Sequence, residues 1–302
     1  MASLRRLARK CRDLAKQHVD DPEVPAAPDG ASGYAPWVQI GLILFRVELE
    51  KNRRETEEYL NEMPDVLAVF NLDEAPHYSS FCRWEQDYRM RELRRLLRRS
   101  AEQAGWSGVA AIDASGFQRD QTSHHYRNRA NYSFQSLKTT ILIDVNSLAI
   151  KDVHYTTRKS WDGHIWLQVF RRNGEDLRVL TADANYSWSD LREECRAEST
   201  RPLIKHKEQT PLQEAHNARM DAAVYHQRWM SKTGFSLLKQ DDGEKLRSRS
   251  WHGQFRELTR KCIVHNLSQA ASLTRRLLSF SDRIAQSHRR CRLNRRPAMA
   301  YF

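Results

Sequence analysis

The chain has 302 residues, 40% of them hydrophobic and 9% aromatic, so it can bury a core and is not expected to be disordered. Its formal net charge of +12 favours a polyanionic partner, usually DNA or RNA, over a charge that serves solubility alone. Five scattered cysteines without a CxxC pair argue against disulfides and zinc, and no apolar run nears the roughly 20 residues of a membrane span, so a cytoplasmic protein without membrane contact is expected.

The pattern of the first third of the chain predicts helices and no strands. Residues 1–20 form a basic amphipathic helix that lacks the apolar segment of a secretory signal, and residues 21–36, which hold four prolines, form a linker. Helices are then predicted at 37–49, 53–62, 64–71 and 79–103, which together make a helical DNA-binding region at 37–105. The last helix is rich in arginine, and its Arg94, Arg95 and Arg98 are expected to contact DNA phosphates; a solvated basic face is the alternative.

From residue 106 onward, β-rich runs and helical runs alternate. Strands are predicted at 109–113, 136–145, 148–157, 177–183 and 201–206. Helices are predicted at 162–172, 187–198, 216–239 and 249–279. This order predicts an α/β, RNase H-like domain over residues 106–280, with a mixed five-stranded sheet flanked by helices. Residues 281–302 form a basic tail whose end is expected to fray.

Two aspartates each end a predicted strand, Asp113 the first and Asp183 the fourth. In the predicted order these strands are neighbours, so the two carboxylates should meet. Such hard oxygen donors suit Mg²⁺ or Mn²⁺, and two ions roughly 4 Å apart could activate the attacking oxygen and stabilise the leaving oxygen in phosphoryl transfer on DNA. Either aspartate alone could equally be a turn residue.

A third element is the predicted helix 216–239, which carries Tyr225, Arg228, Lys232 and Lys239. At about 100° per residue, the four side chains fall within an arc of about 60°, so they can face the sheet edge and a DNA strand together. An ordinary polar stripe on a surface helix is the alternative.

These segments resemble those of DDE transposases of prokaryotic insertion sequences, in the broad group of families four and five. IDASGF at 112–117 is similar to the group's first aspartate segment and TADANYSW at 181–188 to its second. The spacing Tyr225-x2-Arg228-x3-Lys232-x6-Lys239 fits the group's Tyr, Arg, Glu, Lys signature, and the similarity covers roughly residues 34–275.

The resemblance implies roles for these residues. Asp113 and Asp183 would be catalytic metal ligands, Arg228 and Lys239 would contact DNA phosphates, and Tyr225 would position the backbone. In the similar segment HHYRNRANY, two arginines are further candidates for a DNA contact, namely Arg127 and Arg129.

One position departs from the family pattern, because Lys232 stands where the third acid, a Glu, is expected. Asp221 is expected about 16 Å away along the helix axis, and Glu244 lies beyond the expected helix end, so neither replaces it. Gly234 in the same helix should weaken the helix by roughly 1 kcal/mol.

The resemblance therefore implies a nucleoid-associated transposase, a homodimer that binds terminal inverted repeats and target DNA and uses a two-ion site to cleave and transfer strands. Two alternatives stay open. One is a catalytically impaired DNA-binding remnant, which Lys232 favours, and the other is an RNase H-like nuclease.

Overall fold

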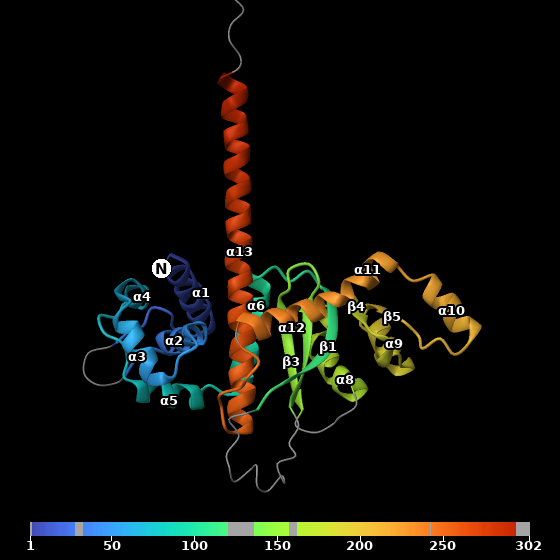
Figure 1. Ribbon diagram of the computed structural model, residues 1–302, viewed down its shortest axis with the longest axis horizontal. Helices are drawn as coiled ribbons and strands as arrows, with labels where there is room; N and C mark the ends of the chain where they lie inside the picture. Colours follow the sequence, from blue (N-terminus) through green and yellow to red (C-terminus); the bar gives the residue numbers. More distant parts are fainter. Residues whose placement is uncertain (1, 28–32, 120–135, 157–161, 242, 294–302) are drawn as a thin grey trace, which may run out of the picture.

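The computed structural model describes residues 2–27, 33–119, 136–156, 162–241 and 243–293. A group of amino-terminal helices packs beside a mixed β-sheet, and one long helix runs through the molecule and projects beyond it (Figure 1). None of the described helices is long and apolar enough to cross a bilayer.

The amino-terminal part contains helices, as predicted. They are α1 (Ala2–His18), α2 (Pro36–Leu49), α3 (Arg53–Asn61), α4 (Pro64–Leu67), the 3₁₀ turn η1 (Ala68–Phe70), α5 (Tyr78–Asp87) and α6 (Met90–Gln103). Local signals fix some boundaries, since Asn52 caps α3 in a capping box with Glu55 and α2 starts at Pro36. The prediction of one helix at 79–103 is wrong, because the backbone of Tyr88 is extended (ψ 102°) and separates α5 from α6.

The sheet has five strands in the order β3-β2-β1-β4-β5. They are β1 (Val109–Phe117), β2 (Leu137–Asp144), β3 (Ile150–Thr156), β4 (Val179–Ala182) and β5 (Arg201–Ile204). Strand β2 pairs antiparallel with both β1 and β3, whereas β4 pairs parallel with both β1 and β5. This is the predicted RNase H-like, mixed α/β architecture.

Helices cover both faces of the sheet. On one face, Ala110 and Ile112 of β1 share a core with Trp166 of α8 (Asp162–Asn173) and Cys195 of α9 (Ser189–Ala197). The short 3₁₀ turns η2 (Gly174–Asp176) and η3 (Ala184–Tyr186) flank β4 in sequence. Because side chains alternate along a strand, Ala111 and Phe117 face the opposite side, against α12 (Met230–Asp241) and α13 (Trp251–Leu293).

The core of this second face also includes the amino-terminal helices. A single cluster of buried residues joins Leu14 of α1 and Phe45 of α2 to Ile143 of β2 and Cys262 of α13. The predicted boundary between residues 105 and 106 therefore separates two segments of chain that share one core. The division of the chain into domains stays a prediction.

Helix α13 is longer than predicted. It runs to Leu293, so it takes in residues that were predicted as a frayed basic tail. Its first half packs on α6, α2 and α1, and its second half projects beyond the rest of the molecule (Figure 1). The part that packs therefore joins the amino-terminal helices to the sheet together with α6, which packs directly on β3.

Candidate active site

The two aspartates are brought together by the pairing of β1 with β4. Val109 pairs with Val179 and Ala111 with Thr181, and the same register continued by two residues sets Asp113 opposite Asp183. Asp183 follows β4 directly, as predicted. The prediction that Asp113 ends its strand is wrong, because β1 continues through Phe117 along β2. Asp113 instead lies where the neighbouring strand β4 stops.

The Asp113 carboxylate is half-buried and fixed by two donors. The Ala114 N–H donates to its Oδ1 at 2.8 Å, and the Ser231 hydroxyl donates to its Oδ2 at 3.2 Å. Burial raises the pKa of Asp113, and the charge of Asp183 adds to this, while the two hydrogen bonds and the charge of Lys232 oppose it. The two carboxylates and Lys232 therefore lie near enough to act on one another.

Asp183 is held by the turn that follows it. Its Oδ1 accepts a hydrogen bond from the backbone N–H of Asn185 at 2.7 Å, and its Oδ2 lies 3.3 Å from the Asn185 amide nitrogen. This N-cap fixes the carboxylate at the start of η3. The printed contacts of the Asp183 carboxylate, within the part of the chain that the structure describes, thus come from its own turn.

The predicted helix at 216–239 is wrong as a continuous element. The segment divides into α10 (Pro211–Ala218), α11 (Ala222–His226), the 3₁₀ turn η4 (Gln227–Trp229) and α12. Asp221 lies outside α11 and caps it, accepting from the Val224 N–H at 3.2 Å. Since η4 interrupts the α-helical geometry at Gln227–Trp229, the spacing of 100° per residue does not hold across the signature residues.

Tyr225 is buried, and two cations lie over its ring. The Arg228 guanidinium is 5.2 Å from the ring centroid, and Lys205 Nζ is also 5.2 Å from it. Lys205 was missed by the sequence analysis. In the β4–β5 ladder Ala182 pairs with Ile204, so Lys205 follows its strand just as Asp183 follows β4. The sequence of the predicted strand at 201–206 could have indicated this residue, since Lys205 directly follows the apolar residues of the strand.

Ser231 was also missed, and no pattern of charge could have found it. It is buried on α12 and faces Asp113, whereas the neighbouring Lys232 is exposed. Residues of α12 and β1 lie side by side here. The position predicted for the third acid therefore lies at the solvent side of the site, with its charge close enough to affect Asp113.

Lys239, at the far end of α12, has an acidic partner of its own. Its Nζ is 3.0 Å from Glu244 Oε1 and 5.4 Å from the centroid of the Phe117 ring. Glu244 is therefore engaged by Lys239, and Asp221 pairs with Arg201 at 3.8 Å. Neither acid takes the place that Lys232 occupies.

The arginines of α6 lie among intramolecular partners. Arg94 is 4.0 Å from Asp152, Arg98 donates to the backbone carbonyl of Arg172 at 2.6 Å, and Arg95 is 3.5 Å from Glu92. The first two contacts hold α6 against the sheet domain, a role that the sequence did not indicate. Their predicted DNA contact stays a prediction. The other two predicted DNA contacts, Arg127 and Arg129, lie outside the described residues.

The predicted two-ion site needs oxygen ligands for both ions. Asp113 and Asp183 supply hard oxygen ligands of the kind that Mg²⁺ and Mn²⁺ prefer. Across the described part of the chain, however, no group of three or more His, Cys, Asp or Glu side chains could hold a metal ion. With an ammonium where a third carboxylate is expected, the residues present do not fit a two-ion site.

The sheet order and the helices on its two faces define an RNase H-like domain. Residues 107–267, just over half of the chain, match the family described as the transposase DDE domain, and the chain belongs to that family. A comparison with curated proteins gives no match. The predicted class of protein, a DDE transposase, is confirmed at this level, and the family implies DNA as the partner.

Proposed function

We propose that this chain binds the ends of an insertion sequence as a transposase does, and that Lys232 impairs its strand cleavage. The observation that supports this most is the meeting of Asp113 and Asp183 beside an exposed lysine. The family supplies the substrate class, and the two aspartates supply oxygen ligands. What the site lacks is the third acid.

The impairment follows from local charge. Replacing a carboxylate by an ammonium changes the charge of the site by two units. A tethered cation near Asp113 stabilises its carboxylate and competes with a divalent ion for the same oxygens. The remaining cations suit a different task. Arg228 and Lys205 both lie near the ring of the buried Tyr225 and are proposed, with Lys239, to hold DNA phosphates.

The test is a nicking assay on duplex DNA that carries the terminal sequences flanking the gene, with Mg²⁺ or Mn²⁺. We expect little cleavage by the chain as it stands and a rise of orders of magnitude for Lys232→Glu. The rise should vanish in Lys232→Glu combined with Asp113→Ala. Lys207→Glu is the matched control, because it makes the same charge change at an exposed lysine in the loop after β5.

Two results would redirect the proposal. Robust cleavage by the unaltered chain that is lost in Asp113→Ala means that another group completes the site. Equal cleavage of DNA with and without the terminal sequences identifies a nuclease instead of a transposase. Calorimetry measures the binding of Mn²⁺ to the unaltered chain and to the Lys232→Glu variant. The comparison separates a failure of metal binding from a failure of the cleavage step.

A further inference from the structure

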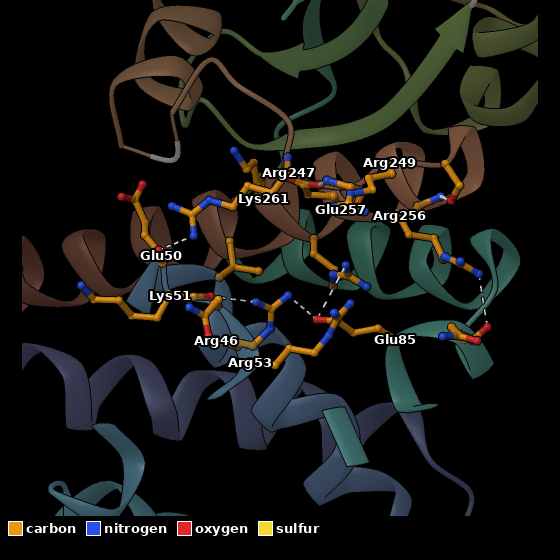
Figure 2. Close-up of a pocket in the computed structure, with 17 residues that line it drawn as sticks. Arg46, Glu50, Lys51, Arg53, Glu85, Arg247, Arg249, Arg256, Glu257 and Lys261 are labelled. Carbon is orange, nitrogen blue, oxygen red and sulfur yellow. Dashed lines mark hydrogen bonds and ion pairs between the residues drawn. The ribbon is translucent and has the colours of Figure 1, made fainter. Parts of the chain in front are cut away.

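A basic cleft of about 860 Å³ lies between the amino-terminal helices and the start of α13 (Figure 2). One wall comes from the end of α2, the turn into α3 and the end of α5, and the other from residues 247–250 and the first turns of α13. None of the aspartates or signature residues of the candidate active site lines it. We call it the interhelical cleft.

Basic side chains dominate its lining, with eight basic residues and three acidic ones. The basic residues are Arg46, Lys51, Arg53, Arg247, Arg249, Arg256, Arg260 and Lys261, and the acidic ones are Glu50, Glu85 and Glu257. Both walls contribute to each set, so the positive charge surrounds the space between them (Figure 2). A space enclosed in this way concentrates the electrostatic potential more than a flat basic surface does.

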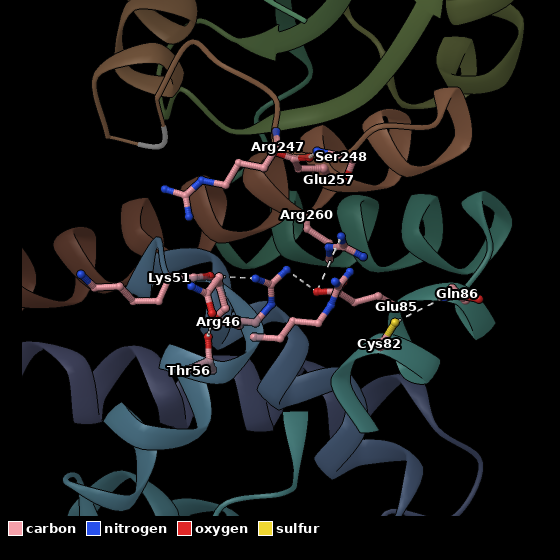
Figure 3. Close-up of polar contacts among 12 residues, drawn as sticks. Arg46, Lys51, Thr56, Cys82, Glu85, Gln86, Arg247, Ser248, Glu257 and Arg260 are labelled. Carbon is pink, nitrogen blue, oxygen red and sulfur yellow. Dashed lines mark hydrogen bonds and ion pairs between the residues drawn. The ribbon is translucent and has the colours of Figure 1, made fainter. Parts of the chain in front are cut away.

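Glu85, the most buried acid of the cleft, is shared by three arginines from three helices. Its carboxylate contacts Arg46 of α2 and lies 2.7 Å from Arg53 of α3 (Figure 2), and it lies 4.0 Å from Arg260 of α13 (Figure 3). Burial raises the pKa of Glu85, but the charges of the three arginines outweigh it and lower the pKa to about 2. One negative charge therefore faces three positive ones.

A second acid, Glu257, is occupied by backbone donors. It accepts the N–H of Arg247 at 2.9 Å and the N–H of Ser248 at 2.7 Å. These bonds fold the chain before α13 into the wall of the cleft. The cleft consequently keeps an excess of positive charge after its own acids are counted.

Arg260 is the deepest cation, and its hydrogen-bonding capacity is unfilled. Its side chain is 4% exposed, and among the described residues its Nη1 has no hydrogen-bond partner; the same is true of Arg46 Nε. Burial lowers the pKa of Arg260, and the charge of Glu85 only partly offsets this. Burying guanidinium N–H groups without acceptors is unfavourable. An anion rich in oxygen acceptors would relieve that cost.

We propose that the interhelical cleft binds backbone phosphates of duplex DNA, as a second contact separate from the candidate active site. This inference rests on the proposed function, which makes DNA the partner. Guanidinium groups pair with phosphate oxygens in a fork geometry, and four of the five basic residues on the second wall are arginines. The described residues that line the cleft include no aromatic ring, so bases are not stacked there and phosphates are what it recognises.

The experiment uses the full chain and measures the affinity for a duplex across a series of salt concentrations. The variant Arg249→Glu with Arg256→Glu changes the rim of the cleft. Its control is Arg196→Glu with Arg219→Glu, which reverses two exposed arginines that do not line the cleft. Each lost phosphate contact should reduce the slope of log K against log salt by about 0.9. We expect a reduction of about two for the rim variant, with a fall in affinity of at least about tenfold, and little change for the control.

A deeper variant, Arg260→Met, tests the buried cation, and circular dichroism shows whether it folds. If Arg260→Met does not fold, the rim variant still tests the inference.

Tripolyphosphate serves as a small-anion probe of the cleft, and its binding is measured by the rise in the temperature of thermal unfolding. Unchanged DNA affinity and slope in the rim variant would overturn the inference. The inference would also be overturned if tripolyphosphate no longer stabilised the rim variant while this variant still bound DNA normally. The cleft would then bind a small polyphosphate and not DNA. Failure of the unaltered chain to bind DNA at all refutes the proposed function instead, which separates the two outcomes.

Discussion

At the scale of single residues, Glu85 forms ion pairs with three arginines, more than any of the predicted site residues forms among the described residues. It connects α2, α3 and α13 through arginines that would otherwise face one another. Removing one partner of a buried charge cluster leaves the others uncompensated, which typically costs about 3–5 kcal/mol. Glu85 therefore acts on the stability of the fold, whereas Lys232 acts on the chemistry of the site.

We predict that Glu85→Gln lowers the free energy of unfolding near neutral pH by a few kcal/mol and that this difference shrinks in acid. The pKa of Glu85 is lowered in the folded state, so its contribution is complete above the ordinary pKa of about 4.5 and is lost as the pH falls towards 2. Urea unfolding at a series of pH values measures it, with the exposed Glu58→Gln as the control. A difference that is independent of pH would contradict the assignment.

At the scale of elements, the close contact between α12 and the sheet depends on Gly234. A Cβ at this position would lie 2.2 Å from Ile143 Cδ1, and Ile143 is fully buried on β2. The expected cost of Gly234 to the stability of the helix stays a prediction, and the structure adds a packing role that the sequence did not indicate. The glycine lets α12 approach the sheet closely enough for Ser231 to reach Asp113.

We predict that Gly234→Ala destabilises the protein by roughly 1–3 kcal/mol, because overpacking outweighs the gain in helix propensity. Ile143→Val removes the clashing methyl group. The double variant should therefore lose less free energy of unfolding than the sum of the losses in the two single variants. Chemical denaturation of the four proteins of this cycle gives the coupling energy. If the two substitutions change the free energy of unfolding additively, α12 can move away from the sheet without loss of stability, and the prediction is contradicted.

At the scale of the whole molecule, the amino-terminal helices and one face of the sheet form one core. Leu14 of α1 and Ile143 of β2 belong to the same buried cluster, and α13 packs against both parts. Proteins with one core tend to unfold in one cooperative transition. The DNA-binding part and the catalytic part predicted from the sequence are therefore coupled in stability.

We predict that Leu14→Ala lowers the stability of both parts together, by about 2–5 kcal/mol, the range for a truncated buried leucine. Native-state hydrogen exchange, followed separately for amides of α2 and of β2, measures this. The exposed Arg9→Ala on α1 is the control and should change neither. Loss of protection in α2 alone would show that the two parts unfold independently.

The sequence predicted a mixed five-stranded sheet in which the first and fourth strands are neighbours, which brings Asp113 near Asp183, because apolar runs are local patterns and allow a small set of topologies. It did not predict the break at Tyr88 or the 3₁₀ turn at 227–229, where tertiary packing overrides helical periodicity. Ser231 was missed because a serine carries no charge pattern. Lys205 could have been found, since it stands at the end of its strand as Asp183 does.

The register that sets Asp113 opposite Asp183 also bears on how such chains diverge. The two carboxylates meet because β1 and β4 pair, and pairing puts no limit on the length of chain that joins the strands. Insertions and deletions between them can accumulate without parting the aspartates. Arg228 lies over the ring of Tyr225 because the two residues are three positions apart, one at the end of α11 and one in η4, so a change in that spacing would separate them. A sequence pattern for finding distant relatives should therefore fix the spacing between Tyr225 and Arg228 and leave the spacing between Asp113 and Asp183 open.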